Sequence, residues 1–263
     1  MPGTSRPITL TIAGSDSGGG AGIQADLKTF AAYDCFGTTV ITAVTAQNTL
    51  GVRAVHPIPT SVIADQLAAL AEDLPPVAVK TGMLATREVV EAVVQGLRTL
   101  SPPCLVVDPV MVATSGDRLL DADAIAAVRD QLLPMATCVT PNLDEAELLT
   151  GLAVRTPEAM LAAAHALVEL GAGAALVKGG HLASDILVDV LVIGDHIERY
   201  TRKRIVTRAT HGTGCTLSAA IAAGMAQGHE LEPAVRSALD YLGRAISAAP
   251  GLGGGNGPVW HGV

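Results

Sequence analysis

Short runs rich in β-branched residues alternate with longer runs rich in alanine, leucine and glutamate along most of the chain. This alternation predicts an α/β fold, a three-layer sandwich in which helices cover both faces of a mainly parallel central sheet. The turn at Gly194, Asp195 and His196 indicates a hairpin late in the chain. We predict strands at residues 8–13, 38–44, 77–80, 104–107, 137–140, 174–178, 186–193 and 197–200, an extended segment at 52–58, and helices at 24–33, 61–72, 87–100, 123–133, 144–150, 157–170, 216–227 and 232–248.

The composition allows a large buried core. The chain has 263 residues, of which 49% are hydrophobic and 16% charged, whereas typical domains have about 25% charged residues. This apolar excess favours a deeply buried parallel sheet, a subunit interface, or both. The length fits one large domain or at most two, and because no repeat or linker divides the chain we predict a single domain over residues 1–263.

No run reaches the about 18 uninterrupted apolar residues of a membrane span. The N-terminus also lacks the basic and apolar blocks of a signal peptide, so we expect a cytoplasmic protein without a membrane partner. The four cysteines show no metal-ligand spacing, which favours a reduced protein without structural zinc or disulfides.

Charge and aromatic content argue against a nucleic-acid partner. The net charge is −8 and aromatic residues make up 2% of the chain, whereas nucleic-acid-binding domains present a basic face and single-strand binders add stacking aromatics. The densest basic run, residues 202–204, is typical of a solvated strand or loop.

A glycine loop at Gly212, Thr213 and Gly214 precedes Cys215 and an alanine-rich run that is typical of a helix. The first amides of a helix lack internal partners and carry partial positive charge, and glycine lets a ligand approach them closely. The pattern therefore predicts an anion site with a thiol at its mouth, where a helix N-terminus lowers the pKa of a cysteine. A plain turn followed by a buried cysteine is the alternative interpretation.

Polar or glycine-rich clusters follow several predicted strands. Because ligands in parallel α/β folds bind beyond the carboxyl ends of the strands, these clusters predict a site at one edge of the sheet. They are residues 14–16, 80–82, 108–109, 141–142 and 178–180.

Three common motifs are absent. The glycine loop at residues 14–22 lacks the ending of a P-loop and the spacing of a dinucleotide-binding loop, and no nucleophile elbow is present. A hydrolase that uses Cys215 with His211 or His181, and a binding module without catalysis, stay open on these observations.

Several ordered motifs resemble the ribokinase-like small-molecule kinases and, within them, the hydroxymethylpyrimidine and hydroxymethylpyrimidine-phosphate kinases of thiamine biosynthesis. The resemblance runs from residue 8 to residue 259 and rests on residues 13–26, 44–49, 80–84, 108–111, 140–147, 178–181 and 212–215. Pyridoxal kinases of the same superfamily are the alternative. They often have a further cysteine in a flap that corresponds here to residues 112–120, which contain none and resemble the pyrimidine branch.

The resemblance implies that ATP phosphorylates 4-amino-5-hydroxymethyl-2-methylpyrimidine and then its monophosphate. It places Gln47 at the ring, where an amide can both donate and accept hydrogen bonds; a turn residue is the alternative interpretation. It also implies that Cys215 accepts the proton of the substrate hydroxyl. The expected walls around the ring are Gly14, Met83 and Val110.

The resemblance further implies Mg²⁺ as a cofactor and a homodimer. The amides of residues 212–214 are expected to meet the charge of the transferring group, and Lys178 to reach the triphosphate unless it is a plain surface lysine. Asn142 and Glu145 are expected to arrange the metal and its waters, and they also match a helix capping box. The remaining acidic candidates are Asp108, for the metal, and Asp26, in the first predicted helix.

Overall fold

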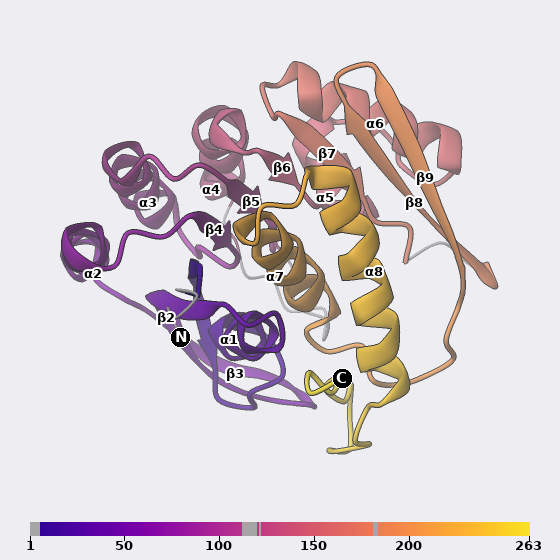
Figure 1. The fold of residues 1–263 in the computed structure, drawn as a ribbon, viewed down its shortest axis with the longest axis horizontal. Coiled ribbons are helices and arrows are strands. Elements are labelled where there is room, and N and C mark those ends of the chain that lie inside the picture. Colours follow the sequence, from indigo (N-terminus) through magenta and orange to yellow (C-terminus); the bar gives the residue numbers. More distant parts are fainter. Residues whose placement is uncertain (1–5, 112–119, 121, 181–183) are drawn as a thin grey trace, which may run out of the picture.

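The computed structural model describes residues 6–111, 120, 122–180 and 184–263. In these parts of the chain nine strands form one sheet in the order β3-β2-β1-β4-β5-β6-β7-β8-β9 (Figure 1). The central strands from β2 to β7 pair in parallel, whereas β3, β8 and β9 add antiparallel pairs at the two edges. The strands are β1 (Ile8–Asp16), β2 (Phe36–Asn48), β3 (Gly51–Pro57), β4 (Ala78–Thr81), β5 (Leu105–Val107), β6 (Cys138–Val139), β7 (Ala174–Val177), β8 (Ile186–Ile193) and β9 (His196–Lys203).

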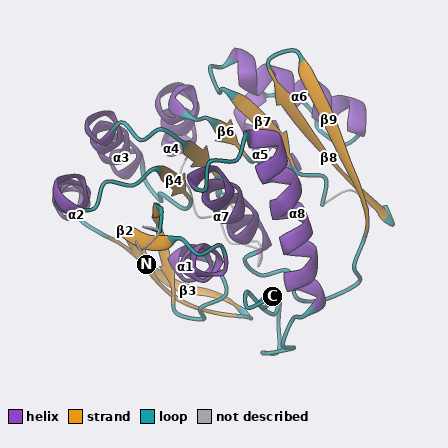
Figure 2. Ribbon diagram, in the orientation of Figure 1, coloured by secondary structure: helices purple, strands orange, loops and turns teal. Residues whose placement is uncertain are grey.

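Helices cover both faces of the sheet, which confirms the predicted three-layer sandwich (Figures 1 and 2). Helices α1, α7 and α8 pack together on one face, and α2 to α6 follow one another across the other face. None of the helices in the described ranges has the length and apolar character needed to cross a membrane. The helices are α1 (Gly22–Ala32), α2 (Thr60–Asp73), α3 (Arg87–Leu100), α4 (Ala122–Ala127), α5 (Leu143–Thr150), α6 (Pro157–Glu169), α7 (Thr213–Ala226) and α8 (Leu231–Ser247).

Helix α3 shows how local sequence sets an element. The Thr86 side chain accepts a hydrogen bond from the amide of Val89 at the start of the helix, and Ser101 ends it in a left-handed conformation. Between these ends, valines and Leu97 form a single buried stripe. Because that stripe faces the sheet, burial of its apolar surface stabilises the helix, whereas the exposed face contributes little.

Helix α7 is different, because its residues from Thr216 to Gly224 are all buried. A helix that is apolar on every side belongs inside a protein, and α7 lies between α1 and α8 and packs on β1, β4 and β5 (Figure 1). Small alanine side chains permit this close packing on all sides. The result is that the first turn of α7, which includes Thr213 and Gly214 of the predicted glycine loop, lies at the carboxyl edge of the parallel strands.

The predicted elements and the hairpin at Gly194 are confirmed, with differences at their ends. Strand β1 continues to Asp16 and β2 to Asn48, because the two pair with each other, and β2 with β3, beyond the predicted ends. Gln47 therefore lies within a strand. The predicted helix 123–133 changes after α4 into a π-helical turn, Val128–Leu132, and a 3₁₀ turn, Leu133–Met135, where Pro134 cannot supply an α-helical hydrogen bond.

Candidate active site

A cavity of about 1040 Å³ opens at the carboxyl edge of the parallel strands. All five strand-end clusters contribute to its wall, as does the first turn of α7, so the structure brings the predicted clusters together at one edge of the sheet. Asp26 is the exception among the candidate residues, because it lies beneath the cavity and not on its wall. The candidates on the wall are Gly14, Gln47, Met83, Asp108, Val110, Asn142, Glu145, Lys178, Gly212, Thr213, Gly214 and Cys215.

The first turn of α7 forms one end of the polar wall. Gly212 precedes the helix with φ +78°, and no side chain caps the helix start. A Cβ atom on Gly214 would lie 3.3 Å from Nζ of Lys178 and 3.7 Å from Oδ2 of Asp108. The absence of a side chain thus brings the positive end of the helix next to an ammonium group, an arrangement suited to an anion.

Lys178 follows β7 and points to Asp108 at the end of β5. Its Nζ lies 3.0 Å from Oδ1 of Asp108, which Thr140 also approaches with its hydroxyl at 3.3 Å. Although burial lowers the pKa of Lys178, the carboxylates of Asp108 and Glu145 raise it overall, so the ammonium stays charged. The surface-lysine interpretation is wrong, because only 15% of this side chain is exposed.

Asn142 and Glu145 form the predicted capping box at the start of α5. The Glu145 amide donates to Oδ1 of Asn142 at 2.9 Å, and the Asn142 amide donates to Oε2 of Glu145 at 2.8 Å. Burial raises the pKa of Glu145 to about 7, and nearby Asp108 adds to this, while Lys178 opposes it. Two carboxylates at the same wall therefore compete for one lysine, and a cation beside them would relieve their repulsion.

Cys215 is partly exposed at the cavity, whereas Cys35, Cys104 and Cys138 are buried, and all four cysteines are free. The expected lowering of the pKa of this thiol by the helix N-terminus is opposed by burial. Burial raises the pKa of Cys215 to about 11, which outweighs the opposing effects of Lys80 and the Gly22 amide. The thiol needs to lose its proton before it can act as a base.

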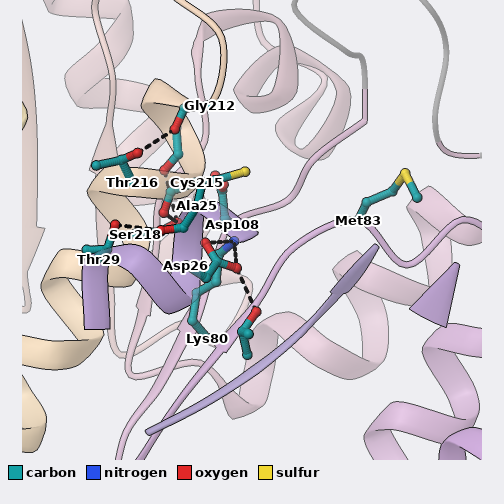
Figure 3. Close-up of polar contacts among 12 residues, drawn as sticks. Ala25, Asp26, Thr29, Lys80, Met83, Asp108, Gly212, Cys215, Thr216 and Ser218 are labelled. Atoms are coloured by element: carbon teal, nitrogen blue, oxygen red, sulfur yellow. Dashed lines mark hydrogen bonds and ion pairs between the residues drawn. The ribbon is translucent and has the colours of Figure 1, made fainter. Parts of the chain in front are cut away.

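A buried ion pair lies beneath Cys215, as Figure 3 shows. The Nζ atom of Lys80, on β4, lies 3.0 and 2.8 Å from the two carboxylate oxygens of Asp26, on α1. The Thr11 hydroxyl donates to the same carboxylate at 2.6 Å. Sequence reasoning assigned no role to Lys80, although a lysine that ends a buried strand run was a signal for a paired charge.

The candidates for ring binding lie on a different part of the cavity wall from the first turn of α7. A Cβ atom on Gly14 would lie 2.6 Å from Cε of Met83, so the absent side chain leaves room for that methionine. Oε1 of Gln47 accepts a hydrogen bond from the Thr45 hydroxyl at 3.1 Å, which orients the amide. Val110 completes this part of the wall. The structure thus brings the four candidates for ring binding together.

The far end of the cavity is apolar and was missed from the sequence. Leucine and isoleucine side chains of α8 lie there, in a helix whose pattern indicated only packing. The basic run 202–204 also lines the cavity, and Arg202 donates to Asp189, which accepts the Gly179 amide as well. The apolar wall residues at this end are Leu187, Ile205, Leu217, Leu239, Leu242 and Ile246.

The chain is similar to known proteins along nearly its whole length. A model of the family described as phosphomethylpyrimidine kinase matches residues 16–260. A hydroxymethylpyrimidine/phosphomethylpyrimidine kinase of Rhizobium meliloti is 55% identical over 257 residues, which cover 97% of this chain and 96% of that one.

Solved structures agree with this similarity. The ADP complex of Bacillus subtilis pyridoxal kinase has a TM-score of 0.91 at 39% identity and covers 98% of both chains. A phosphomethylpyrimidine kinase from Clostridium difficile has a TM-score of 0.83 at 43% identity and covers 92% of this chain and 100% of that one.

Fold, cavity and relatives together define a small-molecule kinase with the ribokinase-like fold. Within that class the chain belongs to the phosphomethylpyrimidine kinase family. The fold, the family and the kinase class predicted from the sequence are confirmed. Residues 112–119 of the flap at 112–120, and His181, lie outside the described residues, so the structure does not test the predictions made for them.

Proposed function

We propose that the chain transfers the γ-phosphoryl group of ATP to 4-amino-5-hydroxymethyl-2-methylpyrimidine and then to its monophosphate, in thiamine biosynthesis. The observation that carries this proposal is the composition of one cavity. A helix N-terminus, Lys178 and Cys215 lie on one part of its wall, and Gln47 and Met83 lie on another. An anion-binding group thus shares a cavity with groups suited to a small aromatic ring.

For the alcohol, the thiolate of Cys215 accepts the hydroxyl proton while the oxygen forms a bond to the γ-phosphorus and the bond to ADP breaks. Lys80 and the Gly22 amide favour this thiolate. Lys178 and the amides of residues 212–214 stabilise charge on the transferring group, and loss of one such donor costs on the order of 3 kcal/mol. The monophosphate needs no base, because its acceptor oxygen is already anionic.

The nucleotide is proposed to lie between the apolar end and the polar wall. Leu239, Leu242 and Ile246 of α8 offer an apolar surface for the base, and Lys178 lies where the phosphates would end. This proposal is supported by the pyridoxal kinase of similar fold that was solved as an ADP complex.

The wall also fits Mg²⁺. Asp108 and Glu145 present carboxylate oxygens, the ligand type that this ion prefers. Burial, with a further contribution from Asp108, raises the pKa of Glu145, and a cation beside it would favour the ionised carboxylate. Asp108 would hold the ion directly and Glu145 through water. When bound, Mg²⁺ supplies neutralisation of charge on the phosphate oxygens.

A pyridoxal kinase is the second candidate, because solved structures with that name superpose on this chain with a TM-score of 0.91. A panel with ATP, Mg²⁺ and three acceptors separates the two: the hydroxymethylpyrimidine, its monophosphate and pyridoxal. We expect ADP release and phosphorylated product with both pyrimidines at higher kcat/KM than with pyridoxal. Turnover with pyridoxal alone would contradict the proposal.

The same panel tests the role of Cys215. Cys215→Ala is expected to lower alcohol phosphorylation more than about tenfold and to spare the phosphate acceptor. Unchanged turnover of the alcohol would remove Cys215 as the base, and a covalent adduct formed without ATP would indicate a nucleophile instead. The single domain, the homodimer and the cytoplasmic location stay predictions within this proposal.

A further inference from the structure

Asp16, at the end of β1, is a buried carboxylate surrounded by donors. The Gly18 amide donates to Oδ1 at 2.8 Å, and the amides of Gly20 and Ala21 donate to Oδ2 at 2.9 Å. Nε2 of His211 also lies 2.8 Å from Oδ2. A carboxylate that accepts several hydrogen bonds stays ionised and can only accept. Nε2 of His211 therefore carries a hydrogen and donates a hydrogen bond to Asp16.

The backbone around His211 meets the loop after Asp16 directly. A Cβ atom on Gly212 would lie 1.8 Å from the carbonyl oxygen of Gly20, and one on Gly20 would lie 2.4 Å from the His211 ring. Two glycines therefore permit backbone contact between the loop that begins α7 and the loop that follows β1. The His211 amide is also fixed, because it donates to the Gly257 carbonyl at 3.1 Å.

The neighbours of Asp16 reach the opposite wall of the cavity. The Thr45 hydroxyl lies 3.0 Å from the Ser15 carbonyl oxygen and 3.1 Å from Oε1 of Gln47, and these two acceptors share its single hydrogen. On the other side of Asp16, the Ser17 hydroxyl donates to the Gln47 carbonyl at 2.7 Å and accepts from the Gln47 amide at 2.8 Å. The segment 15–17 is thus bonded to Gln47 directly through Ser17 and indirectly through Thr45 and the Ser15 carbonyl, and it is bonded to His211 through Asp16.

We propose that His211 is a positioning residue, whose hydrogen bond to Asp16 holds the anion-binding turn of α7 at a set distance from the wall that binds the acceptor. The inference rests on the proposed function. Phosphoryl transfer requires the attacking oxygen to lie about 3–3.5 Å from phosphorus, and an error of about 1 Å can cost a hundredfold in rate. Both residues border the cavity, but their proposed role is to set that distance and not to exchange a proton with either reactant.

The test compares two amide side chains that differ in reach by one methylene group. In His211→Gln the amide nitrogen can occupy the place of Nε2 and donate to Asp16, whereas in His211→Asn it reaches only as far as Nδ1. Both variants keep a polar, uncharged side chain, and thermal melts check that both fold. Steady-state kinetics with both pyrimidine acceptors, ADP affinity by calorimetry, and the ratio of ADP released to product formed are then measured.

We expect His211→Asn to lower kcat about 30-fold or more with both acceptors, with ADP affinity changed less than about threefold. ADP should exceed product, because water takes phosphoryl groups that miss the acceptor. His211→Gln should restore kcat to within about fivefold of the wild type. An equal loss in both variants, unchanged kcat in His211→Asn, or a matching loss of ADP affinity would overturn the inference. A wild-type chain without transfer to any acceptor would overturn the proposed function itself, and the inference with it.

Discussion

Lys80→Met tests the ion pair beneath the cavity. Both side chains of the Lys80–Asp26 pair are 0% exposed, and the shortest distance between them is 2.8 Å. Burial lowers the pKa of Lys80 and raises that of Asp26, while their mutual attraction opposes both effects. The two short contacts from Nζ of Lys80 and the Thr11 hydroxyl favour the ionised carboxylate, so we treat the pair as charged. Removal of the ammonium leaves a buried carboxylate with Thr11 as its remaining side-chain donor, and loss of one partner of such a pair costs about 3–5 kcal/mol.

The size of the effect on melting follows from the chain length. Unfolding entropies of about 2.1 cal/mol/K per residue predict that a loss of about 4 kcal/mol lowers Tm by roughly 7 °C in a chain of 263 residues. Urea unfolding followed by circular dichroism measures the free energy itself. In the wild type, the raised lysine pKa means stability that is present below the unfolded value of 10.5. In the variant, burial raises the pKa of the unpaired Asp26 without opposition from Lys80, so the loss should grow as pH rises above the range in which Asp26 is protonated.

Two further variants make this prediction specific. The double variant Lys80→Met with Asp26→Asn removes both charges and should recover most of the loss, since a neutral pair leaves no buried charge. Lys28→Met removes an exposed lysine from α1, the same helix as Asp26, and should change stability by less than about 1 kcal/mol. A loss below about 1 kcal/mol for Lys80→Met, or a double variant as unstable as the single one, would refute the reasoning.

Three other predictions concern the cavity wall. Burial raises the pKa of Glu145 from 4.5 to about 7, so the stability of the chain falls as pH rises between these values. Glu145→Gln should therefore raise the free energy of unfolding by up to about 3 kcal/mol at pH 8 but not at pH 4. Equal effects in urea unfolding at both pH values would contradict this. Gly212→Ala should destabilise the chain by more than about 2 kcal/mol, because its Cβ would lie 1.8 Å from the Gly20 carbonyl oxygen. The control Gly228→Ala, at φ +89° with open space around it, should cost about 1 kcal/mol. Similar melting temperatures for the two variants would count against the close contact at Gly212. Burial raises the pKa of Cys215 to about 11, so the rate of alcohol phosphorylation should rise steeply from about pH 7 to 9, whereas the rate with the monophosphate should not. A flat pH profile for the alcohol would argue against the thiolate as base.

Much of the site could be predicted because its residues follow strands. The carboxyl ends of parallel strands lie at one edge of the sheet, so residues that follow neighbouring strands lie close together there. These residues are Gly14, Lys80, Asp108, Asn142 and Lys178. The capping box at Asn142 was also readable, because its two partners are three residues apart. The apolar end was not readable, since the leucines of α8 look the same whether they pack in a core or line a cavity.

The sequence by itself determined the layers of this protein and the presence of a helix after the glycines, although α7 begins at Thr213, earlier than the predicted residue 216. Alternating strand and helix patterns, the glycines before Cys215 and the alanine run after it act through neighbours in the chain, and local physics is enough to set them. The resemblance then supplied the family, which the relatives confirm.

Only the tertiary structure decided the electrostatics of the site. Lys80 meets Asp26, and His211 meets Asp16, across 54 and 195 residues of chain. The thiol of Cys215 loses its expected acidity because packing removes water from around it. Charges respond to whatever surrounds them in space, and those surroundings exist only after strands and helices from distant parts of the chain have packed together.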